Sequence, residues 1–371
     1  MVPNLRFSSF ADPFRIYTLK EVLQRISFPV TVDENKLYYQ IGIRSHSKGI
    51  FYKEAEIGRQ IGNKRIFWIE PNCLILNIVF AWEQAVAKTS EKEVGMVASH
   101  RFPMYKVLNN SLDYIVDFFK TEKGKQLLQM ASPGGAGRNK TLNQDFFLNS
   151  KIYLPSLNEQ LKTSELIELI EDRIETQIKI INDYKLLKKY ITKSFIKQKG
   201  TSYLLSEIAE LGRGRVISSV EISKQKNPIY PVYSSQTSNN GVMGYLDNYD
   251  YEGEYITWTT DGANAGTVYY RNGKFNCTNV CGILKIKNGY DAYYISNILN
   301  CYTKKYVSTN LANPKLMNNV MANIKINLPS IERQKYFSNI LKAIEYRVKI
   351  EQDIKLNLVK QKVFLLKNMF L

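Results

Sequence analysis

The sequence predicts an α+β protein: two mixed α/β globular domains separated by two long, antiparallel, coiled-coil-like helices, arranged as a pseudo-two-fold tandem repeat. Three observations support this fold class. One segment of the chain occurs twice, and such self-similarity indicates a duplicated architecture. Each copy contains more than thirty consecutive residues without Pro or Gly, as a long helix requires. The chain before each copy has apolar and aromatic runs broken by turn signals, which is typical of a mixed globular domain.

The repeated segment covers 139–196 and 313–370, which align without a gap at an offset of 174 residues. In this alignment 16 of 58 positions are identical, and both copies begin their long helix with Leu-Pro-Ser-x-x-x-Gln. A second correspondence pairs Tyr17 with Tyr203 at an offset of 186. The two globular parts therefore begin and end alike, although their interiors differ in sequence and by 12 residues in length.

The two long segments are predicted to be helices that pack against each other. Apolar residues recur at every third or fourth position in the first copy, which places a stripe along one side of its helix; the stripe of the second copy is interrupted at Gln352 and Lys355. About 36 helical residues make a rod of roughly 54 Å, which suits a second rod as partner. The acidic start of the first helix and the basic end of the second favour an antiparallel pair, although a solvated charged face also explains these charges. The residues expected at the helix–helix contact are Ile167, Ile170, Ile174, Ile181, Leu187, Ile191, Leu341, Ile344, Val348, Leu358 and Leu365.

The domain limits follow from this repeat. We predict globular domains at 1–153 and 200–327, and long helices at 154–199 and 328–371. Within the globular domains the patterns predict helices over 112–130 and 292–307, a short amphipathic helix from Thr18, and strands over 64–70 and 255–259.

The composition favours a polyanionic partner. The chain has 371 residues, with 51 Lys and Arg against 34 Asp and Glu, and the excess is spread along its whole length. Such a charge suits nucleic acid first and an anionic membrane surface second. No run of eighteen apolar residues and no signal-peptide core is present, and the four cysteines do not form a disulfide pattern. We therefore expect no membrane association and a reducing cytoplasm.

The chain resembles the specificity subunit of type I restriction-modification systems. The resemblance rests on two unlike globular parts that each lead into Leu-Pro-Ser-x-x-x-Gln and a long helix, on the opening PNLRFSSF, and on the segment 232–282, which is similar to a target-recognition domain of that family. It covers essentially the whole chain. The Gly-rich stretch at 134–143 departs from its counterpart in the second copy.

This resemblance implies a non-catalytic subunit that recognises DNA. Each target-recognition domain would read one half of a bipartite, asymmetric site in double-stranded DNA, while the helices would set the gap and dock two methyltransferase (M) subunits. Restriction/translocase (R) subunits would complete the assembly. The chain itself would need no cofactor or metal; S-adenosylmethionine, and ATP with Mg²⁺ for restriction, would belong to the partner subunits.

Polar loops supply the candidate DNA contacts, because base edges and phosphates are bound by Arg, Lys, Asn, Gln, Ser and Thr side chains. In the first globular domain the candidates are Arg44, His46, Lys48, Arg59, Gln60, Asn63, Lys64, Arg101, Arg138 and Lys140. In the second they are Arg213, Arg215, Ser235, Gln236, Thr237, Asn239, Asn240, Thr260, Asn264 and Lys315. An ordinary solvated turn is the alternative for each loop. Trp258 is mainly a core residue by its type, with DNA contact as the alternative.

Enzymatic motifs are incomplete. Asn227-Pro228-Ile229-Tyr230 lacks the second Pro of an adenine-methyltransferase motif, and no phosphate-binding Gly-x-x-x-x-Gly-Lys-Ser/Thr loop occurs. Cys277 and Cys281 are expected on one face of a single strand, as buried small residues rather than half of a zinc site. Two other functions stay open: the recognition part of another bipartite-site system of type IIB or IIG, and a coiled-coil scaffold that binds no DNA.

Overall fold

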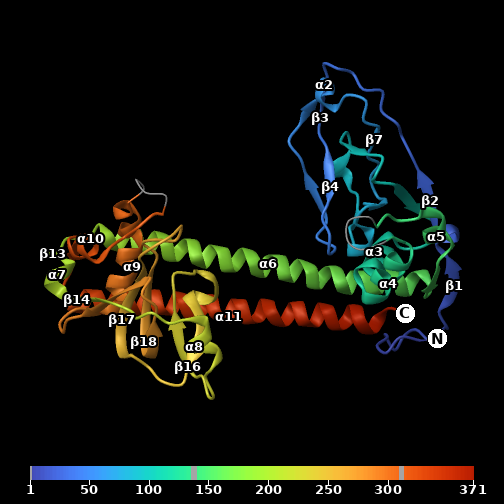
Figure 1. Ribbon diagram of the computed structural model, residues 1–371. Helices are drawn as coiled ribbons and strands as arrows, with labels where there is room; N and C mark the ends of the chain where they lie inside the picture. The colour runs from blue at the N-terminus through green and yellow to red at the C-terminus, as the bar shows by residue number, and fades with distance from the viewer. Residues whose placement is uncertain (1, 135–139, 309–312) are drawn as a thin grey trace. The chain divides into compact units, whose positions relative to one another are not determined.

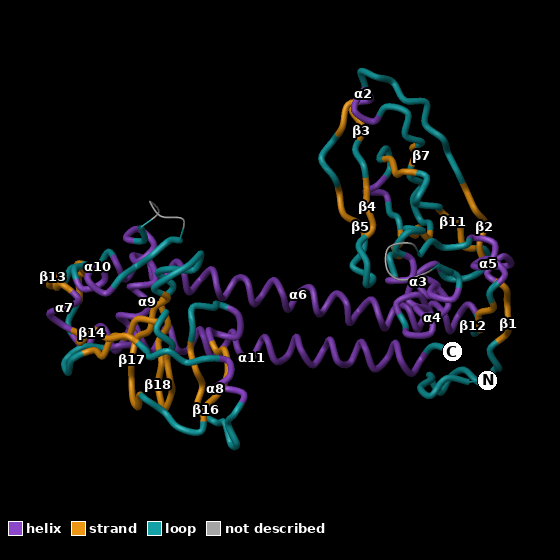
Figure 2. Tube along the Cα trace, in the orientation of Figure 1, coloured by secondary structure: helices purple, strands orange, loops and turns teal. Residues whose placement is uncertain are grey.

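The computed structural model describes residues 2–134, 140–308 and 313–371, which form two compact units. Unit 1 comprises Met1–Gln177 and Ile354–Leu371, and unit 2 comprises Ile178–Asp353. Two long helices contribute to both units, namely α6 (Leu157–Ile196) and α11 (Ile331–Met369) (Figure 1). Both are unbroken along their length (Figure 2).

Unit 1 combines short strands with a small helical layer. Its principal sheet has four antiparallel strands in the order β2-β11-β8-β9, and the remaining strands pair two by two. The core lies where α3 and α4 meet the ends of the long helices, and there the Tyr114 ring stacks on the Phe370 ring with centroids 4.6 Å apart. The elements are β1 (Arg15–Thr18), α1 (Leu19–Val22), β2 (Leu23–Ile26), β3 (Leu37–Tyr38), β4 (Ile41–Ile43), β5 (Ile50–Tyr52), β6 (Glu56–Ile57), α2 (Gly58–Ile61), β7 (Ile66–Trp68), β8 (Leu74–Leu76), η1 (Ala81–Glu83), β9 (Val86–Lys88), η2 (Glu91–Glu93), β10 (Val97–Ser99), β11 (Met104–Val107), α3 (Leu112–Lys120), α4 (Glu122–Met130), α5 (Gln144–Asn149) and β12 (Lys151–Leu154).

Unit 2 is built on one larger sheet. Its six strands run in the order β14-β19-β17-β18-β15-β16, and all neighbours are antiparallel except the pair β15 and β18. The main apolar core includes residues of this sheet, of α9 and of the long helices. The elements are β13 (Thr201–Leu204), α7 (Leu205–Ile208), β14 (Ala209–Arg213), α8 (Ser219–Ser223), β15 (Tyr230–Tyr233), η4 (Ser238–Gly241), β16 (Val242–Leu246), β17 (Tyr251–Thr259), β18 (Val268–Cys277), β19 (Cys281–Ile286), α9 (Ala292–Tyr302), η5 (Thr303–Tyr306), α10 (Asn318–Ala322) and β20 (Lys325–Leu328).

Each globular part is closed by its own pair of antiparallel strands, and the two pairs are equivalent. In unit 1 β1 pairs with β12, so that Arg15 lies opposite Leu154. In unit 2 β13 pairs with β20, so that Thr201 lies opposite Leu328. Just before β13, a Cβ on Gly200 would lie 2.3 Å from the carbonyl oxygen of Leu328, so only Gly fits this approach. The sequence correspondences at offsets of 174 and 186 thus mark the strands that close each part.

The Gln of the repeated motif joins each long helix to its globular part. Gln160 Oε1 accepts a hydrogen bond from the Ser111 amide at 2.9 Å, and Gln334 Oε1 accepts one from the Asp291 amide at 3.1 Å. Each Gln also donates from Nε2 to the carbonyl oxygen of the Pro in its own motif. Ser111 and Asp291 are the N-cap residues of α3 and α9. Since both Gln side chains are almost fully buried, these bonds satisfy amide groups that would otherwise be unpaired.

The long helices run antiparallel within each unit, as predicted. In unit 1 Glu171 forms an ion pair with Lys362 at 2.6 Å. In unit 2 Lys188 pairs with Glu345, and further along α6 the Phe195 ring stacks on the Phe337 ring with centroids 3.7 Å apart. As residue numbers increase along α6, the numbers of the residues that they contact on α11 therefore decrease.

One residue of the predicted apolar stripe is misplaced. Leu187 is 45% exposed, whereas the neighbouring Lys188 is half-buried in its pair with Glu345. The buried side of α6 follows alternating steps of three and four, through Ile181, Tyr184 and Lys188, as in a coiled coil. The prediction for Leu187 was wrong because it followed residue type instead of this spacing. Of the other predicted residues, Ile167, Ile181, Leu341, Ile344 and Leu358 are buried, and Ile170, Ile174, Ile191, Val348 and Leu365 are half-buried.

The single helix predicted over 112–130 is two helices, α3 and α4. Thr121 separates them, because its Oγ1 donates to the carbonyl oxygen of Phe118 at 2.6 Å and accepts from the Gly124 amide at 3.1 Å. A Cβ on Gly124 would lie 2.2 Å from the Phe118 carbonyl oxygen, so the close turn requires Gly. The prediction was wrong because Thr121 interrupts the pattern without a Pro or Gly at its own position.

Two further helices are shorter than predicted. The helix over 292–307 is α9, which ends at Tyr302 and is followed by the 3-10 turn η5. The helix from Thr18 has only four residues, because Leu23–Ile26 instead forms β2 and pairs with β11. Strand pairing overrides the weak helical periodicity there. The strands predicted over 64–70 and 255–259 correspond to the shorter β7 and the longer β17.

Candidate nucleic-acid interface

Arg213 and Lys315 of unit 2 converge on one carboxylate. Arg213 ends β14, and its Nη2 lies 3.8 Å from Asp261 Oδ2. Lys315 Nζ lies 3.7 Å from Asp261 Oδ1, and the Asp261 and Lys315 backbones form an antiparallel bridge. These loosely paired side chains are partly exposed. Two predicted DNA contacts, about a hundred residues apart in the chain, therefore lie at one edge, where exposed ion pairs of this length contribute little stability.

Arg215 is bound to two carboxylates within unit 2. Its guanidinium bonds Glu221 at 2.7 and 3.1 Å and Asp250 at 3.1 Å. The hydrogen bonds that Arg215 donates to Glu221 raise the pKa of Arg215, and the same pairing lowers the pKa of the Glu221 carboxyl. Although Arg213 and Arg215 look equivalent in the sequence, Arg215 already has two carboxylate partners.

The loop between β15 and β16 presents several polar side chains. Thr237, Asn239 and Asn240 are exposed, and both Asn residues have positive φ angles of 48° and 53°. Such left-handed backbone is uncommon outside Gly but is tolerated by Asn. Gln236 donates a hydrogen bond to the Val242 carbonyl oxygen, which shapes the loop from within. Ser235 and Gln236 are half-buried.

Arg271 supports this loop and was not among the predicted residues. Its guanidinium lies between two tyrosine rings, 3.5 Å from the Tyr233 centroid and 4.4 Å from the Tyr269 centroid. Nε donates to Thr257 Oγ1 at 3.2 Å, and Nη2 donates to the Asn240 carbonyl oxygen at 2.9 Å. Only 4% of the residue is exposed, and this burial lowers the pKa of Arg271. The one sequence signal was a charged residue directly after the run Val268-Tyr269-Tyr270.

The loop that follows β17 presents fewer groups than predicted. Thr260 has no exposed surface, and its hydroxyl donates to Asp261 Oδ2 at 2.5 Å, whereas Asn264 is exposed. Trp258 is also fully buried, and its Nε1 donates to the Leu316 carbonyl oxygen at 2.9 Å. Thr260 and Trp258 therefore hold the loops together and do not face solvent.

Cys277 and Cys281 do not share a strand. Cys277 ends β18 and Cys281 begins β19, with a tight turn closed by the hydrogen bond from the Cys281 amide to the Thr278 carbonyl oxygen at 2.9 Å. The single strand was a wrong prediction, because the turn contains no Gly or Pro. Both thiols are buried, as predicted.

In unit 1 Arg44, His46 and Lys48 lie on one exposed turn between β4 and β5. His46 has a φ of 58°, and its amide donates to the Glu83 carbonyl oxygen at 2.6 Å. The Arg44 guanidinium lies over the Phe51 ring at 5.3 Å. The turn is therefore held by its backbone, while the side chains of His46 and Lys48 extend into solvent.

The predicted residues on and after α2 are all exposed. Arg59 is already engaged, because its Nε lies 3.6 Å from Glu34 Oε2 and its Nη2 donates to Asn35. Gln60 accepts a hydrogen bond at its Oε1 from a backbone amide at 3.1 Å, whereas Asn63 and Lys64 follow the helix in an exposed turn. Asn63 and Lys64 are thus more available for a ligand than Arg59.

Strand pairing brings further cations to the same region. Arg101 is exposed just beyond β10, and β10 pairs with β7, which follows Lys64. Arg25 and Arg65 line a cavity in this unit. Arg65 ends the polar loop that contains the predicted Lys64, whereas nothing local in the sequence marks Arg25. The Lys140 ammonium lies 5.0 Å from the Trp82 ring centroid. The predicted contact Arg138 lies outside the described residues.

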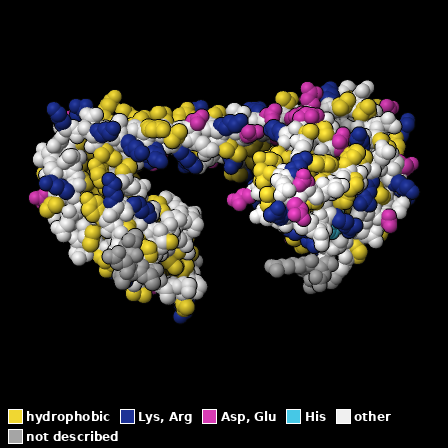
Figure 3. All heavy atoms as spheres, turned by 90° about the horizontal axis from the view of Figure 1, so that it is seen from above, with side chains coloured by type: hydrophobic (Ala, Val, Ile, Leu, Met, Phe, Trp, Pro, Cys, Tyr) yellow, Lys and Arg dark blue, Asp and Glu magenta, His cyan; other side chains and the backbone are white. Residues whose placement is uncertain are grey.

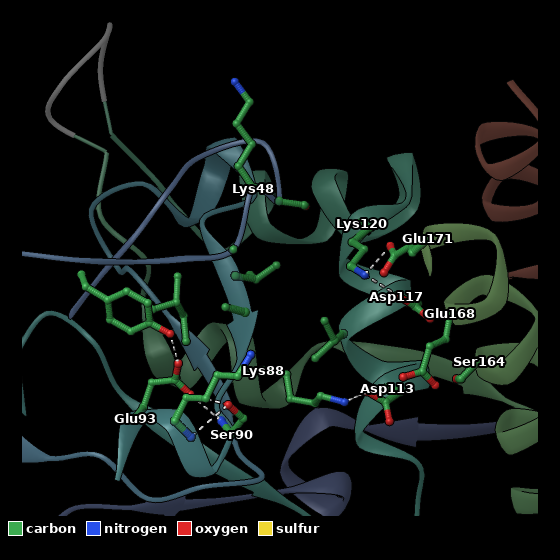
Figure 4. A pocket seen from close by; sticks show the side chains of 18 residues that line it. Lys48, Lys88, Ser90, Glu93, Asp113, Asp117, Lys120, Ser164, Glu168 and Glu171 are labelled. Carbon is green, nitrogen blue, oxygen red and sulfur yellow. Dashed lines mark hydrogen bonds and ion pairs between the residues drawn. The ribbon is translucent and has the colours of Figure 1, made fainter. Parts of the chain in front are cut away.

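A larger cavity of about 500 Å³ in unit 1 carries charges of both signs (Figure 4). Lys120 Nζ pairs with Asp117 at 2.8 Å and with Glu171 at 3.0 Å. Burial raises the pKa of Asp117 to about 6, although Lys120 opposes the shift. Burial likewise disfavours the ionised Glu171, but Lys120 and Lys362 more than offset it and lower the pKa of Glu171. Because its wall carries five carboxylates against four lysines, this cavity is poorly suited to a polyanion.

Positive charge is distributed over both units. Lys and Arg side chains are scattered across the face that Figure 3 shows, without a single dominant patch. Among residues 2–134, 140–308 and 313–371, no cluster of three or more His, Cys, Asp or Glu could hold a metal ion. Within the same ranges, no helix combines the length and apolarity needed to cross a bilayer.

Comparison with known proteins identifies relatives of both sequence and fold. The family model of the type I restriction modification DNA specificity domain matches residues 199–361. The chain is 44% identical over 142 residues to the N-terminal part of a putative type I specificity subunit of Mycoplasma pneumoniae, a match covering 38% of this chain and 75% of that protein. It is 36% identical over 199 residues to another such subunit of the same organism, covering 52% and 82%. The match to the specificity subunit of its MpnII restriction enzyme is 42% over 146 residues, covering 39% of this chain and 43% of that protein.

Solved structures agree on the fold. The crystal structure of a type I restriction-modification system S subunit from M. genitalium has a TM-score of 0.63 at 14% identity, covering 100% of this chain and 99% of that chain. A structure described as showing complex assembly and conformational transition of the type I restriction-modification system has a TM-score of 0.63 at 14% identity, covering 96% and 97%. Together with the sequence relatives, these matches show that the chain belongs to the family of type I restriction-modification specificity subunits.

Proposed function

We propose that this chain is the DNA-reading subunit of a type I restriction-modification system, with recognition domains at 1–153 and 200–327 and spacer helices at 154–199 and 328–371. Each domain reads one half of a bipartite, asymmetric site in double-stranded DNA. The specificity-subunit family is non-catalytic. In this proposal two M subunits transfer methyl groups from S-adenosylmethionine, R subunits use ATP and Mg²⁺, and the assembly acts in the cytoplasm.

One observation carries the proposal: two globular parts with the same closure have unlike interiors. Each is closed by an equivalent strand pair and an equivalent buried Gln, yet one contains a four-stranded sheet and the other a six-stranded sheet. Equivalent closure supports the same role in the protein, whereas different interiors present different side chains to a ligand. Two different half-sites follow from two different reading surfaces.

The long helices are proposed to set the gap and to bind the M subunits. Their antiparallel pairing within each unit supports a spacer role. In unit 1 α11 also leaves large apolar side chains exposed at a helical spacing, which suits a partner surface. These residues are Leu356, Val359, Val363 and Phe364.

Mapping methylated adenines tests the proposal directly. The chain would be expressed with its M subunits in a host that lacks this methylation, and a single bipartite motif with a fixed gap is expected. Methylation without such a motif would reject the function. A scaffold that binds no DNA predicts no methylation dependent on this chain, and a type IIB or IIG assignment predicts a partner that combines methyltransferase and nuclease activities.

The spacer role has its own test. Seven residues inserted into both α6 and α11 would lengthen each helix by about 10 Å. The preferred gap should then increase by up to about three base pairs, while both half-sites stay the same. An unchanged gap would reject the spacer role and leave DNA reading intact.

A further inference from the structure

A cavity of about 230 Å³ opens in unit 1 where β2, β7, β11 and α5 meet. Its wall carries the side chains of Arg25, Arg65 and His100, all of which are largely exposed. The rest of the wall is mainly apolar and aromatic. It consists of Ile26, Ser27, Phe67, Ile78, Phe102, Pro103, Met104 and Gln144.

Strand register brings the three basic groups together. Arg65 directly precedes β7 and His100 directly follows β10, and these strands pair so that Ser99 lies opposite Ile66. The His100 amide donates to the Arg65 carbonyl oxygen at 3.2 Å. Arg25 lies in β2 of the four-stranded sheet, where it is opposite a residue of β11. The backbone positions of the three basic residues are therefore fixed by the hydrogen bonds of two strand pairs, β7 with β10 and β2 with β11.

The charge of this cluster is uncompensated. Among the described residues, neither Arg25 nor Arg65 forms an ion pair with a carboxylate. Two other arginines of unit 1 do have acid partners, since Arg6 is bound to Glu159 at 2.7 Å and Arg59 lies 3.6 Å from Glu34. Two guanidinium groups on the wall of one cavity, neither with an acid partner, favour an anionic ligand.

The chemistry of the wall selects the class of anion. Phe67, Phe102 and Met104 provide an apolar floor, and Met104 is almost fully buried beneath it. Guanidinium groups donate to phosphate oxygens in paired, charge-assisted hydrogen bonds, so Arg25 and Arg65 suit a phosphate group. Donors around an apolar floor match a sugar–phosphate unit, in which a charged phosphate is joined to a largely apolar deoxyribose.

We propose that this cavity binds one sugar–phosphate unit of the DNA backbone, with Arg25 and Arg65 on the phosphate and Phe67 and Phe102 against the deoxyribose. This inference rests on the DNA-reading function proposed above. The site positions the first recognition domain on the duplex and carries no sequence information.

The test is a double variant, Arg25→Gln with Arg65→Gln, in the full chain. Binding to the bipartite duplex and to a scrambled duplex would be measured across a salt series. We expect about a tenfold loss of affinity, equal on both duplexes, and a slope of log K against log salt that is smaller by about one. Arg173→Gln, which removes an exposed arginine of α6, should leave the slope unchanged.

Further controls separate the possible failures. The conservative variants Arg25→Lys with Arg65→Lys should retain most of the slope, and matching thermal unfolding curves would exclude loss of folding as the cause. An unchanged slope in the Gln double variant, or a loss confined to the bipartite duplex, would overturn the backbone site while DNA reading stands. If the unaltered chain bound neither duplex, the proposed function would fail and this inference with it.

Discussion

Arg271 donates a hydrogen bond from Nη2 to the main-chain carbonyl oxygen of Asn240 at 2.9 Å, which joins the buried part of the six-stranded sheet to an exposed polar loop. The two residues are 31 positions apart in the chain. Because the guanidinium is also held between Tyr233 and Tyr269, its position is set by the sheet and not by the loop. The loop conformation therefore depends on a residue that has almost no exposed surface itself.

Replacing Arg271 should reduce sequence discrimination. Arg271→Met removes the hydrogen bond to Asn240, so the loop loses its support while the exposed cations of unit 2 remain. We expect at least about a tenfold loss of affinity for the bipartite duplex, with little change for a scrambled duplex. Arg271→Lys should lose discrimination too, because an ammonium cannot reproduce the planar stack and fork. Equal losses on both duplexes would contradict a role of Arg271 in sequence discrimination; thermal unfolding checks that each variant folds.

Arg213 and Arg215 form a matched pair for testing phosphate contact. Arg213 is only loosely paired with Asp261, whereas Arg215 is bound to Glu221 and Asp250. Arg213→Ala should weaken binding several-fold on specific and random duplexes alike, with a smaller salt slope. Arg215→Ala should leave the slope unchanged and lower the free energy of unfolding by about 1 kcal/mol or less. The reverse ranking of the two slopes would contradict this assignment.

The buried carboxyl of Asp117 should make stability depend on pH. Its pKa in the folded chain is about 6, above that of an unfolded aspartate, so between about pH 4 and pH 6 the folded chain binds the extra proton. The stability contributed by this group therefore falls as pH rises. Asp117→Asn removes the titration, and relative to the unaltered chain its free energy of unfolding should rise by about 1–3 kcal/mol between pH 4 and pH 7.

Denaturant unfolding at pH 4 and pH 7 measures this difference. Asp172→Asn, an exposed position on α6, is the control and should show no comparable trend. A difference for Asp117→Asn that decreases toward neutral pH would mean that the ion pair with Lys120 outweighs the cost of burial.

The coiled-coil spacing predicts different losses of unfolding free energy for two apolar residues of α6. Ile181 is 6% exposed and Leu187 is 45% exposed. Ile181→Ala should lower the free energy of unfolding by about 2–4 kcal/mol, because it leaves a cavity between the helices. Leu187→Ala should change it by less than about 0.5 kcal/mol. Equilibrium unfolding of both variants measures these changes. Similar losses of unfolding free energy would contradict the assigned contact side of α6.

Much of the architecture could be read from local and repeated patterns. The duplication follows from the repeated segment. The long uninterrupted helices and their opposite direction follow from the spacing of Pro, Gly, apolar and charged residues. One error arose from a local hydroxyl cap within the apolar pattern, and another arose from a tertiary contact. Thr121 divides a helix through its hydroxyl, and Leu23–Ile26 forms a strand because β11 is available as a partner.

The candidate interface was less predictable than the fold. Residue type alone treats Arg213 and Arg215 alike, and it places Thr260 on the surface although its side chain is buried. It also misses Arg25 and Arg271, because each acquires its role from residues distant in the chain.

The amino-acid sequence by itself determined that this protein is a duplicated pair of unlike globular parts joined to two long helices, since helix length follows from local spacing and the duplication follows from the aligned repeat. Only the tertiary structure decided which basic side chains are neutralised by carboxylates and which remain available to an anion. The reason is physical: the strength of an ion pair depends on distances of a few ångströms, and pairing between remote strands sets those distances.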